Sequence, residues 1–222
     1  MTSAAQTSES EWTVGRLLAW TCDYLTRHGV PDARLAAEVL LAHAAECRRI
    51  DLYARFEQIP AAEKIDRFRE LVRRAAAHEP VAYLVGEKEF FSRPFRVTPD
   101  VLIPRPETET LVEATLDQWR KAGADQPRFL DVGAGSGCIA VTLLAEVAAA
   151  TAVASDVAAA ALEVARLNAE RHRVADRLTL VTADRLDLPA AAVPPDGFDA
   201  VVSNPPYIGS ADIERLDAAV RE

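Results

Sequence analysis

The sequence has few of the residues that build a disulfide framework or a metal site. Among its 222 residues there are only three cysteines and four histidines. Cys22, Cys47 and Cys138 are scattered, without the paired spacing of a zinc site or a redox motif. We therefore expect reduced cysteines that fill apolar space in a reducing compartment, and no metal site.

Long hydrophobic runs are also missing. No stretch approaches the roughly 20 consecutive apolar residues of a transmembrane helix. Residues 1–10 are polar and lack the apolar centre of a signal peptide. The sequence therefore predicts a cytoplasmic protein without a membrane partner.

Basic residues are fewer than acidic ones. The chain has 25 Lys and Arg against 34 Asp and Glu, which gives a formal net charge of −9. Indiscriminate nucleic-acid binding needs a basic face that neutralises phosphates, so the charge argues against that class, although a local basic patch remains compatible with it. Half of the residues are hydrophobic, enough for a sizeable core in one large domain or two small ones.

Residues 1–85 have the apolar periodicity of helices joined by short turns. One helix is predicted to begin after Thr13, its N-cap, and to end before Gly29. Pro31-Asp32 opens a second helix, and a third ends before Pro80. This part of the chain predicts a small helical bundle.

Residues 86–107 have the pattern of a connector. Two β-rich runs between Gly86 and Val97 lie on either side of a Ser-Arg-Pro turn, which is typical of a hairpin. The string Ile-Pro-Arg-Pro-Glu-Thr-Glu follows, and its prolines stiffen the entry to the next element. Glu107 or Thr108 is expected to start a helix there.

From residue 108 onward, predicted strands and helices alternate, as in an α/β fold with a parallel sheet. The strand over residues 128–132 leads into a glycine loop with the spacing Gly-x-Gly-x-Gly, which differs from the loop of dinucleotide enzymes. Glycines let the backbone approach a ligand closely, and the following helix start favours electron-rich atoms. The candidate loop residues are Gly133, Ala134, Gly135, Ser136 and Gly137.

Acidic residues follow the next two predicted strands. Asp156 comes after the strand over residues 151–155, where a carboxylate accepts both hydroxyls of a ribose. The alternative is that Asp156 caps the next helix. Asp184 follows the strand over residues 178–182, where an acid often receives the amino group of adenine; a surface turn is the alternative there.

The last predicted strand, residues 198–202, has the apolar run of a strand covered on both faces. It stops at Ser203-Asn204-Pro205-Pro206-Tyr207-Ile208, whose prolines favour a rigid, extended turn. In open α/β sheets, ligands bind at this end of the strands. The carboxamide before the prolines and the aromatic ring after them distinguish this turn from a plain strand end.

That group of residues suits a weakly nucleophilic nitrogen, whose lone pair is delocalised into a π system. The side-chain oxygen of Asn204 and the backbone carbonyl of Pro205 would accept its N–H bonds and fix its orientation. Tyr207 offers a face on which a planar group stacks, and Pro206 shapes the slot. We therefore expect these four residues to be catalytic.

These motifs resemble those of the release-factor glutamine methyltransferase family. The order of strands, glycine loop and acids is that of a class I S-adenosylmethionine-dependent methyltransferase, and the hairpin, the proline string and Asn-Pro-Pro-Tyr are typical of the family. The resemblance runs from about Trp12 to the end. It implies a helical substrate-binding domain over residues 1–85, a hairpin connector over 86–107 and a Rossmann-like catalytic domain over 108–222.

The resemblance also implies the reaction. The family methylates the side-chain amide nitrogen of glutamine in the Gly-Gly-Gln motif of peptide chain release factors, with S-adenosylmethionine as cofactor and S-adenosylhomocysteine as product. It places Asn204 near the methionine part of the cofactor as well. The residue that matches Arg185 flanks the adenine and is often aromatic, so Arg185 would stack there through its guanidinium plane. We expect a monomer.

Two other functions fit part of the pattern. A nucleic-acid methyltransferase acting on adenine N6 or cytosine N4 uses the same motif, but it needs a basic approach path that this chain does not offer. An inactive module that binds release factor is the other alternative. After Ile208 only one helix, over about residues 212–220, is predicted, whereas a class I sheet continues through further strands, so we expect an incomplete sheet.

Overall fold

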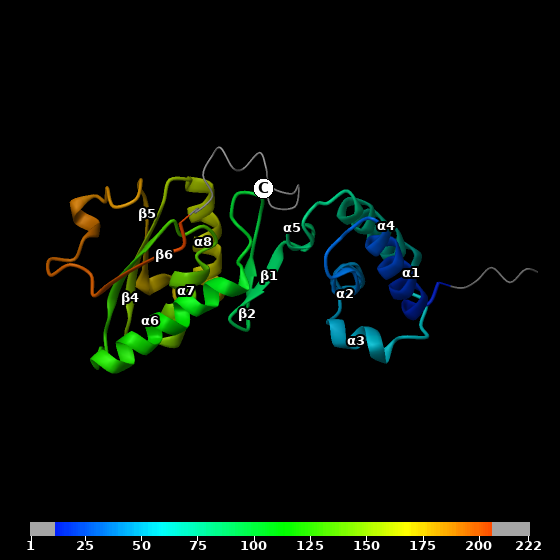
Figure 1. Ribbon diagram of the computed structural model, residues 1–222, viewed down its shortest axis with the longest axis horizontal. Coiled ribbons are helices and arrows are strands. Elements are labelled where there is room, and N and C mark those ends of the chain that lie inside the picture. The colour runs from blue at the N-terminus through cyan, green and yellow to red at the C-terminus, as the bar shows by residue number, and fades with distance from the viewer. Residues whose placement is uncertain (1–11, 206–222) are drawn as a thin grey trace, which may run out of the picture. The chain divides into compact units, whose positions relative to one another are not determined.

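The computed structural model describes residues 12–205, which form two units (Figure 1). The first unit is helical and ends at Val85, and the second begins at Gly86. Each unit has its own hydrophobic core. No helix in the described range 12–205 is long and apolar enough to cross a membrane.

The helical unit confirms the three predicted helices of the bundle and contains two further short helices that the sequence did not predict. Its helices are α1 (Val14–Arg27), α2 (Ala33–Ala45), α3 (Arg49–Ala54), α4 (Ala62–Ala76) and α5 (Val81–Val85). As predicted, Thr13 caps α1, and its hydroxyl accepts a hydrogen bond from the Arg16 backbone N–H at 3.3 Å. The core contains Leu25, Leu40 and Phe68, each almost fully buried.

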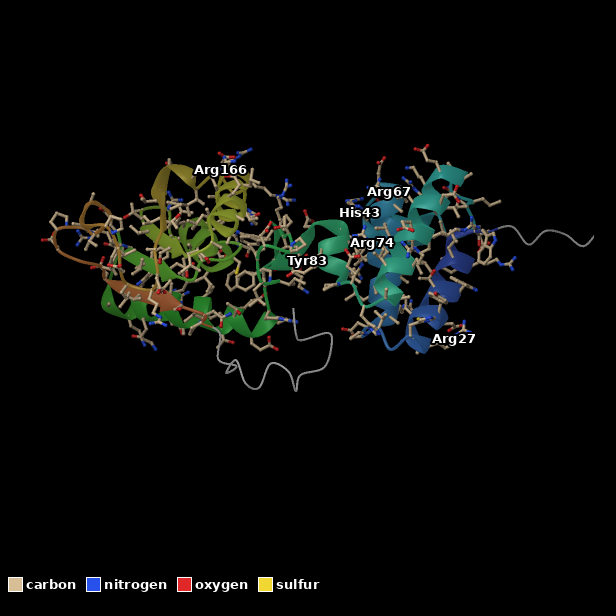
Figure 2. All side chains as sticks on the ribbon, turned by 90° about the horizontal axis from the view of Figure 1, so that it is seen from above. Arg27, His43, Arg67, Arg74, Tyr83 and Arg166 are labelled. Carbon is tan, nitrogen blue, oxygen red and sulfur yellow. The ribbon has the colours of Figure 1, made fainter. Side chains whose placement is uncertain are left out.

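Polar side chains join α2 to α4 at the edge of this core. Arg67 on α4 donates to His43 Nε2 at 3.0 Å, and both residues belong to the helical unit (Figure 2). Arg67 also lies 3.3 Å from Glu46, and Lys64 donates to the Ala45 carbonyl at 2.6 Å. The Lys64 contact satisfies one carbonyl at the carboxyl end of α2, where the last helical carbonyls have no partner within the helix.

The predicted hairpin is present, with a different turn. It consists of β1 (Glu87–Phe90) and β2 (Arg93–Arg96), paired antiparallel. Phe91 and Ser92 form the two-residue turn, with φ of 50° and 56°, the left-handed values of a hairpin turn that matches strand twist. The predicted Ser-Arg-Pro turn is wrong, because Arg93 and Pro94 already belong to β2.

Several side chains hold the hairpin against the α/β unit. Arg171 lies 2.7 Å from the Glu87 carboxylate, and His172 Nε2 lies 2.9 Å from the Pro94 carbonyl. Glu109 accepts from the Phe91 backbone N–H at 2.8 Å. The hairpin is thus an integral part of the second unit.

The second unit contains a four-stranded parallel sheet among the described residues. Its strands are β3 (Arg128–Val132), β4 (Thr151–Asp156), β5 (Leu178–Thr182) and β6 (Ala200–Ser203), in the spatial order β5-β4-β3-β6. Its helices are α6 (Glu109–Ala122), α7 (Cys138–Glu146) and α8 (Ala159–Arg171), with short 3-10 turns η1 (Pro106–Thr108), η2 (Ala175–Arg177) and η3 (Ala190–Ala192). The predicted alternation of strands and helices is confirmed.

One face of this sheet carries the main core cluster. Phe129, Ala152, Ala154 and Val202 pack in one cluster with apolar residues of α6, α7 and α8. Val201, which alternates to the other face, is 58% exposed. The prediction of a last strand covered on both faces is therefore wrong for the described residues.

The order of the strands creates a switch point between β3 and β6. From β3 the chain moves outward to β4 and β5, then returns to pair β6 on the other side of β3. Open α/β sheets bind ligands at this place, outside the carboxyl ends of the strands. The prediction of an early end to the sheet, and Pro206, Tyr207, Ile208 and the helix over about 212–220, lie outside the described residues.

Candidate active site

The glycine loop directly follows β3, as predicted. Gly133, Gly135 and Gly137 have φ of 74°, 53° and 75°, values that favour glycine. A Cβ added at Gly133 or Gly135 would meet nothing within 4 Å, whereas one at Gly137 would come within 2.9 Å of the Ala165 Cβ. The first two glycines therefore leave room for a ligand close to the backbone, and the third lets α7 begin against α8.

Asp156 at the end of β4 holds this loop. Its Oδ2 accepts from the Gly135 backbone N–H at 2.9 Å, and its Oδ1 accepts from the Ala158 N–H at 3.0 Å. The helix cap position belongs to Ala158, so Asp156 does not occupy the predicted alternative position of N-cap. A carboxylate oxygen has more than one lone pair, so Asp156 still offers acceptors to a ribose.

Asp131 lies below the loop on β3, and no sequence signal singled it out. It is fully buried, and its Oδ2 accepts from the Ala140 backbone N–H at 3.1 Å. Burial raises the pKa of this carboxyl to about 7. Within residues 12–205 its Oδ1 has no hydrogen-bond partner.

Asn168 on α8 is a second residue that sequence reasoning missed. Its carboxamide is fully buried and donates to the Ser136 carbonyl at 2.8 Å and to the Arg96 carbonyl at 3.0 Å. Its oxygen accepts from the Arg96 N–H at 2.7 Å. Asn168 thus ties the glycine loop to the end of the hairpin, two segments that are far apart in sequence.

Asn204 follows β6 and is half-buried. Because Ser203 pairs with Val132 in the sheet, the residue after β6 is placed beside the glycine loop. The Ser203 hydroxyl donates to the Val132 carbonyl at 2.8 Å, and Asn204 Nδ2 donates to Thr108 Oγ1 at 3.2 Å. Pro205 is exposed, and the other two predicted catalytic residues, Pro206 and Tyr207, lie outside the described range.

The candidate residues that follow β5 are exposed. Asp184 and Arg185 have side chains that are 72% and 88% exposed, and they lie 3.9 Å apart. The Asp187 N–H donates to the Asp184 carbonyl at 3.0 Å, which forms the surface turn considered as the alternative. These two residues follow a strand at the same edge of the sheet, but their side chains extend into solvent.

Metal-ligating groups do not gather in the described part of the chain. No cluster of three or more His, Cys, Asp or Glu side chains there is arranged to hold a metal ion. All three cysteines are free thiols. Burial raises the pKa of the Cys138 thiol to about 12, which keeps it protonated and unreactive.

Family models match both units. The PrmC N-terminal domain matches residues 16–86, and the methyltransferase small domain matches residues 108–219. The boundary between the two matches falls in the same part of the chain as the boundary between the two units.

Relatives match nearly the whole chain. A release factor glutamine methyltransferase of Rhodopirellula baltica is 43% identical over 99% of this chain and 74% of its own length. One of Nitratidesulfovibrio vulgaris is 45% identical over 97% of this chain and 71% of its own length. Among solved structures, the N-terminal domain of human METTL16 in complex with SAH superposes with a TM-score of 0.43 and 23% identity, over 52% of this chain and 47% of that one.

Proposed function

Since this chain belongs to the release factor glutamine methyltransferase family, we propose that it methylates the side-chain amide nitrogen of a glutamine in a peptide chain release factor. The proposed methyl donor is S-adenosylmethionine, and the proposed target is the glutamine of the Gly-Gly-Gln motif. A cytoplasmic location and a monomeric state remain predictions.

The observation that carries the proposal is the position of Asn204. Its carboxamide lies at the switch point of the sheet, where β6 ends beside the glycine loop. A ligand held by the loop and a planar amide held by Asn204 would therefore be neighbours, as a direct transfer between them requires. Effective placement of two reactants in this way supplies a large part of many enzymatic rate accelerations.

Asn204 and Pro205 would make the substrate amide nitrogen a better nucleophile. The lone pair of an amide nitrogen is delocalised into the neighbouring carbonyl, so this nitrogen is a poor nucleophile. The Asn204 Oδ1 and the Pro205 carbonyl oxygen would accept its two N–H bonds, orient the lone pair and stabilise the positive charge that develops on nitrogen. No strong base is required, because the proton leaves to water after the N–C bond has formed.

The glycine loop and Asp156 fit the proposed cofactor. When bound, S-adenosylmethionine supplies a methyl group whose carbon–sulfur bond breaks as the amide nitrogen bonds to that carbon. Gly133 and Gly135 have the free space that an approaching ligand needs, and Asp156 offers acceptors for ribose hydroxyls. Ala134, Ser136 and Gly137 complete the proposed loop, with Asp184 and Arg185 at the adenine, Pro206 shaping the slot and Tyr207 stacking on the substrate amide.

The helical unit is proposed to recognise the release factor. It has an apolar groove of about 290 Å³ lined by Trp12, which precedes α1, and by residues of α1 and α4, among them Trp20, Tyr24 and Phe68. Trp20 is 46% exposed and stacks on Tyr24 with ring centroids 5.0 Å apart. Partly exposed aromatic side chains of this kind are enriched at protein interfaces.

The proposal is tested by following a labelled methyl group. The chain is incubated with S-adenosylmethionine carrying a deuterated methyl group and with a release factor, and peptides are sequenced by mass spectrometry. We expect the label on the glutamine of Gly-Gly-Gln, and no label in a release factor whose glutamine is replaced by glutamate.

Single-stranded DNA rich in adenine and cytosine is the matched alternative substrate in the same assay. Label in the DNA at a comparable rate would favour a nucleic-acid methyltransferase. Absence of label in both substrates, together with no heat of binding for S-adenosylmethionine, would identify an inactive binding module.

A further inference from the structure

Thr108 occupies a position where threonine normally caps a helix. It is the last residue of η1 and directly precedes α6. Its backbone is already helical, with φ of −68° and ψ of −21°, and its side chain makes no capping hydrogen bond. The side chain is also well buried, at 8% exposure. The ordinary reason for a threonine at a helix start therefore does not apply here.

The Thr108 hydroxyl instead contacts the candidate catalytic carboxamide. Its Oγ1 accepts a hydrogen bond at 3.2 Å from Nδ2 of Asn204, which is 96 residues further along the chain. Both residues belong to the α/β unit. The bond uses one of the two N–H donors of the Asn204 side chain and leaves Oδ1 for another partner.

The orientation of this carboxamide decides what Asn204 offers to a substrate. The two ends of an asparagine side chain have nearly the same shape, and a rotation of 180° exchanges an acceptor for a donor. With Nδ2 directed at Thr108, Oδ1 is available to accept an N–H of a substrate amide. In the reverse orientation the Thr108 hydroxyl would donate to Oδ1, and an N–H of Asn204 would face that nitrogen, whose lone pair is needed for bond formation.

We propose that Thr108 is a positioning residue: its hydroxyl anchors the Asn204 carboxamide by accepting from Nδ2, which leaves Oδ1 for the substrate amide. This inference rests on the proposed function, in which Asn204 accepts an N–H of the glutamine. Thr108 does not touch the substrate, and its effect on the reaction passes through Asn204.

The segment around Thr108 is well anchored. The Thr108 N–H donates to the Arg105 carbonyl at 3.0 Å, and the next residue, Glu109, accepts from the Phe91 N–H of the hairpin turn. The side chains of Arg105 and Glu107 are exposed. Within the string Pro-Arg-Pro-Glu-Thr-Glu, Glu109 therefore fixes the hairpin and Thr108 fixes the catalytic carboxamide.

Two variants of one residue separate this role from simple packing. Thr108→Val keeps the shape of the side chain and removes the hydroxyl, whereas Thr108→Ser keeps the hydroxyl and removes a methyl group. We expect Thr108→Val to lower the rate of methyl transfer from the bound complex by roughly three- to tenfold, the value of one hydrogen bond. Thr108→Ser should retain most of that rate, and neither variant should change the affinity for S-adenosylmethionine.

A double-mutant cycle tests whether Thr108 acts through Asn204. In an Asn204→Ala background there is no carboxamide to orient, so adding Thr108→Val should change the remaining rate by less than about twofold. If the two substitutions instead multiply their separate effects, Thr108 acts by another route and the inference is wrong.

A spectroscopic measurement gives an answer that does not depend on turnover. The side-chain ¹⁵N–¹H signals of Asn204 are identified by their loss in Asn204→Ala, and we expect Thr108→Val to shift them and to speed their exchange with water. Unchanged signals would overturn the inference. A wild-type chain that methylates no release factor would overturn the proposed function and this inference with it; an active wild type matched by Thr108→Val would overturn the inference alone.

Discussion

The candidate site has two ends that are built differently. At the switch point between β3 and β6, the key groups are tied to distant parts of the chain: Asn204 to Thr108, and the glycine loop to Asp156 and Asn168. At the end of β5, the side chains of Asp184 and Arg185 are exposed and lie 3.9 Å from each other. An exposed ion pair of this kind contributes little to stability.

The difference matches what each end is proposed to do. Methyl transfer requires the reacting atoms to be held within a few tenths of an ångström, so its groups benefit from being fixed before the ligand arrives. A nucleoside base offers a large planar surface, so side chains can pack against it after it has bound. We therefore expect substitutions at the switch point to have large effects and those at the end of β5 to have small ones.

The largest effect is expected from one substitution made at two glycines of the loop. Gly137→Val combines a left-handed φ with a clash against Ala165, so we expect it to destabilise the α/β unit by roughly 3 kcal/mol or more. Gly135→Val has the unfavourable φ without the clash, so the unit should stay folded. Its side chain would fill the ligand space and weaken S-adenosylmethionine binding roughly tenfold or more.

Thermal denaturation and calorimetric titration separate the two outcomes. If Gly135→Val binds the cofactor as tightly as wild type, the open side of the loop is not the cofactor site. If Gly137→Val unfolds at the wild-type temperature, the close approach of α7 to α8 has no energetic consequence.

Asp131 should make the stability of the α/β unit depend on pH. Burial raises the pKa of its carboxyl from 3.8 to about 7 in the folded protein. Between these values the folded state holds a proton that the unfolded state has lost, so stability falls as pH rises through this window, by up to about 4 kcal/mol. Below pH 3.8 both states are protonated and the penalty is absent.

Asp131→Asn keeps an acceptor for the Ala140 N–H and removes the titration. We expect it to raise the unfolding free energy at pH 8 and to leave it nearly unchanged at pH 4, as measured by urea denaturation. Equal effects at both pH values would show that the Asp131 carboxyl does not titrate in this range.

Asp156 and Asp184 provide matched acids at the two proposed ends of the nucleoside site. Asp156→Ala is expected to weaken S-adenosylmethionine binding by roughly 1–3 kcal/mol, because it removes the proposed ribose contacts and the support of Gly135. Asp184→Ala removes an exposed, solvated charge and should weaken binding by less than about fivefold. Calorimetric titration of both variants with S-adenosylmethionine compares the two effects directly. A larger loss of affinity in Asp184→Ala than in Asp156→Ala would contradict the proposed difference between the two ends of the site.

The sequence predicted the fold well wherever local pattern decides it. The glycine loop, the acid after β4 and the helices of the bundle follow from periodicity, caps and turn residues. The hairpin turn was misplaced because Phe91 and Ser92 adopt left-handed values that neither residue type favours. The exposure of β6 was also missed, since an apolar run does not show which faces of a strand are covered.

Within the candidate site, the sequence identified groups at strand ends and missed those that support them. Asp156 and Asn204 are recognisable because strand ends of a parallel sheet share one edge. Thr108 and Asn168 act through contacts that span 96 and 72 residues, and single-sequence patterns carry no record of such pairs. Thr108 was noticed only as a helix start, which is the common role of its residue type.

The most direct test of the account compares Asn204→Ala with Asn204→Asp in the release-factor assay, with S-adenosylmethionine affinity measured beside it. We expect Asn204→Ala to lower the rate of methyl transfer roughly a hundredfold or more, with a smaller loss of cofactor affinity. Asn204→Asp retains acceptor oxygens and should keep more of the rate. If Asn204→Ala methylates the release factor as fast as wild type, Asn204 is merely the residue after a strand and the proposed site is wrong.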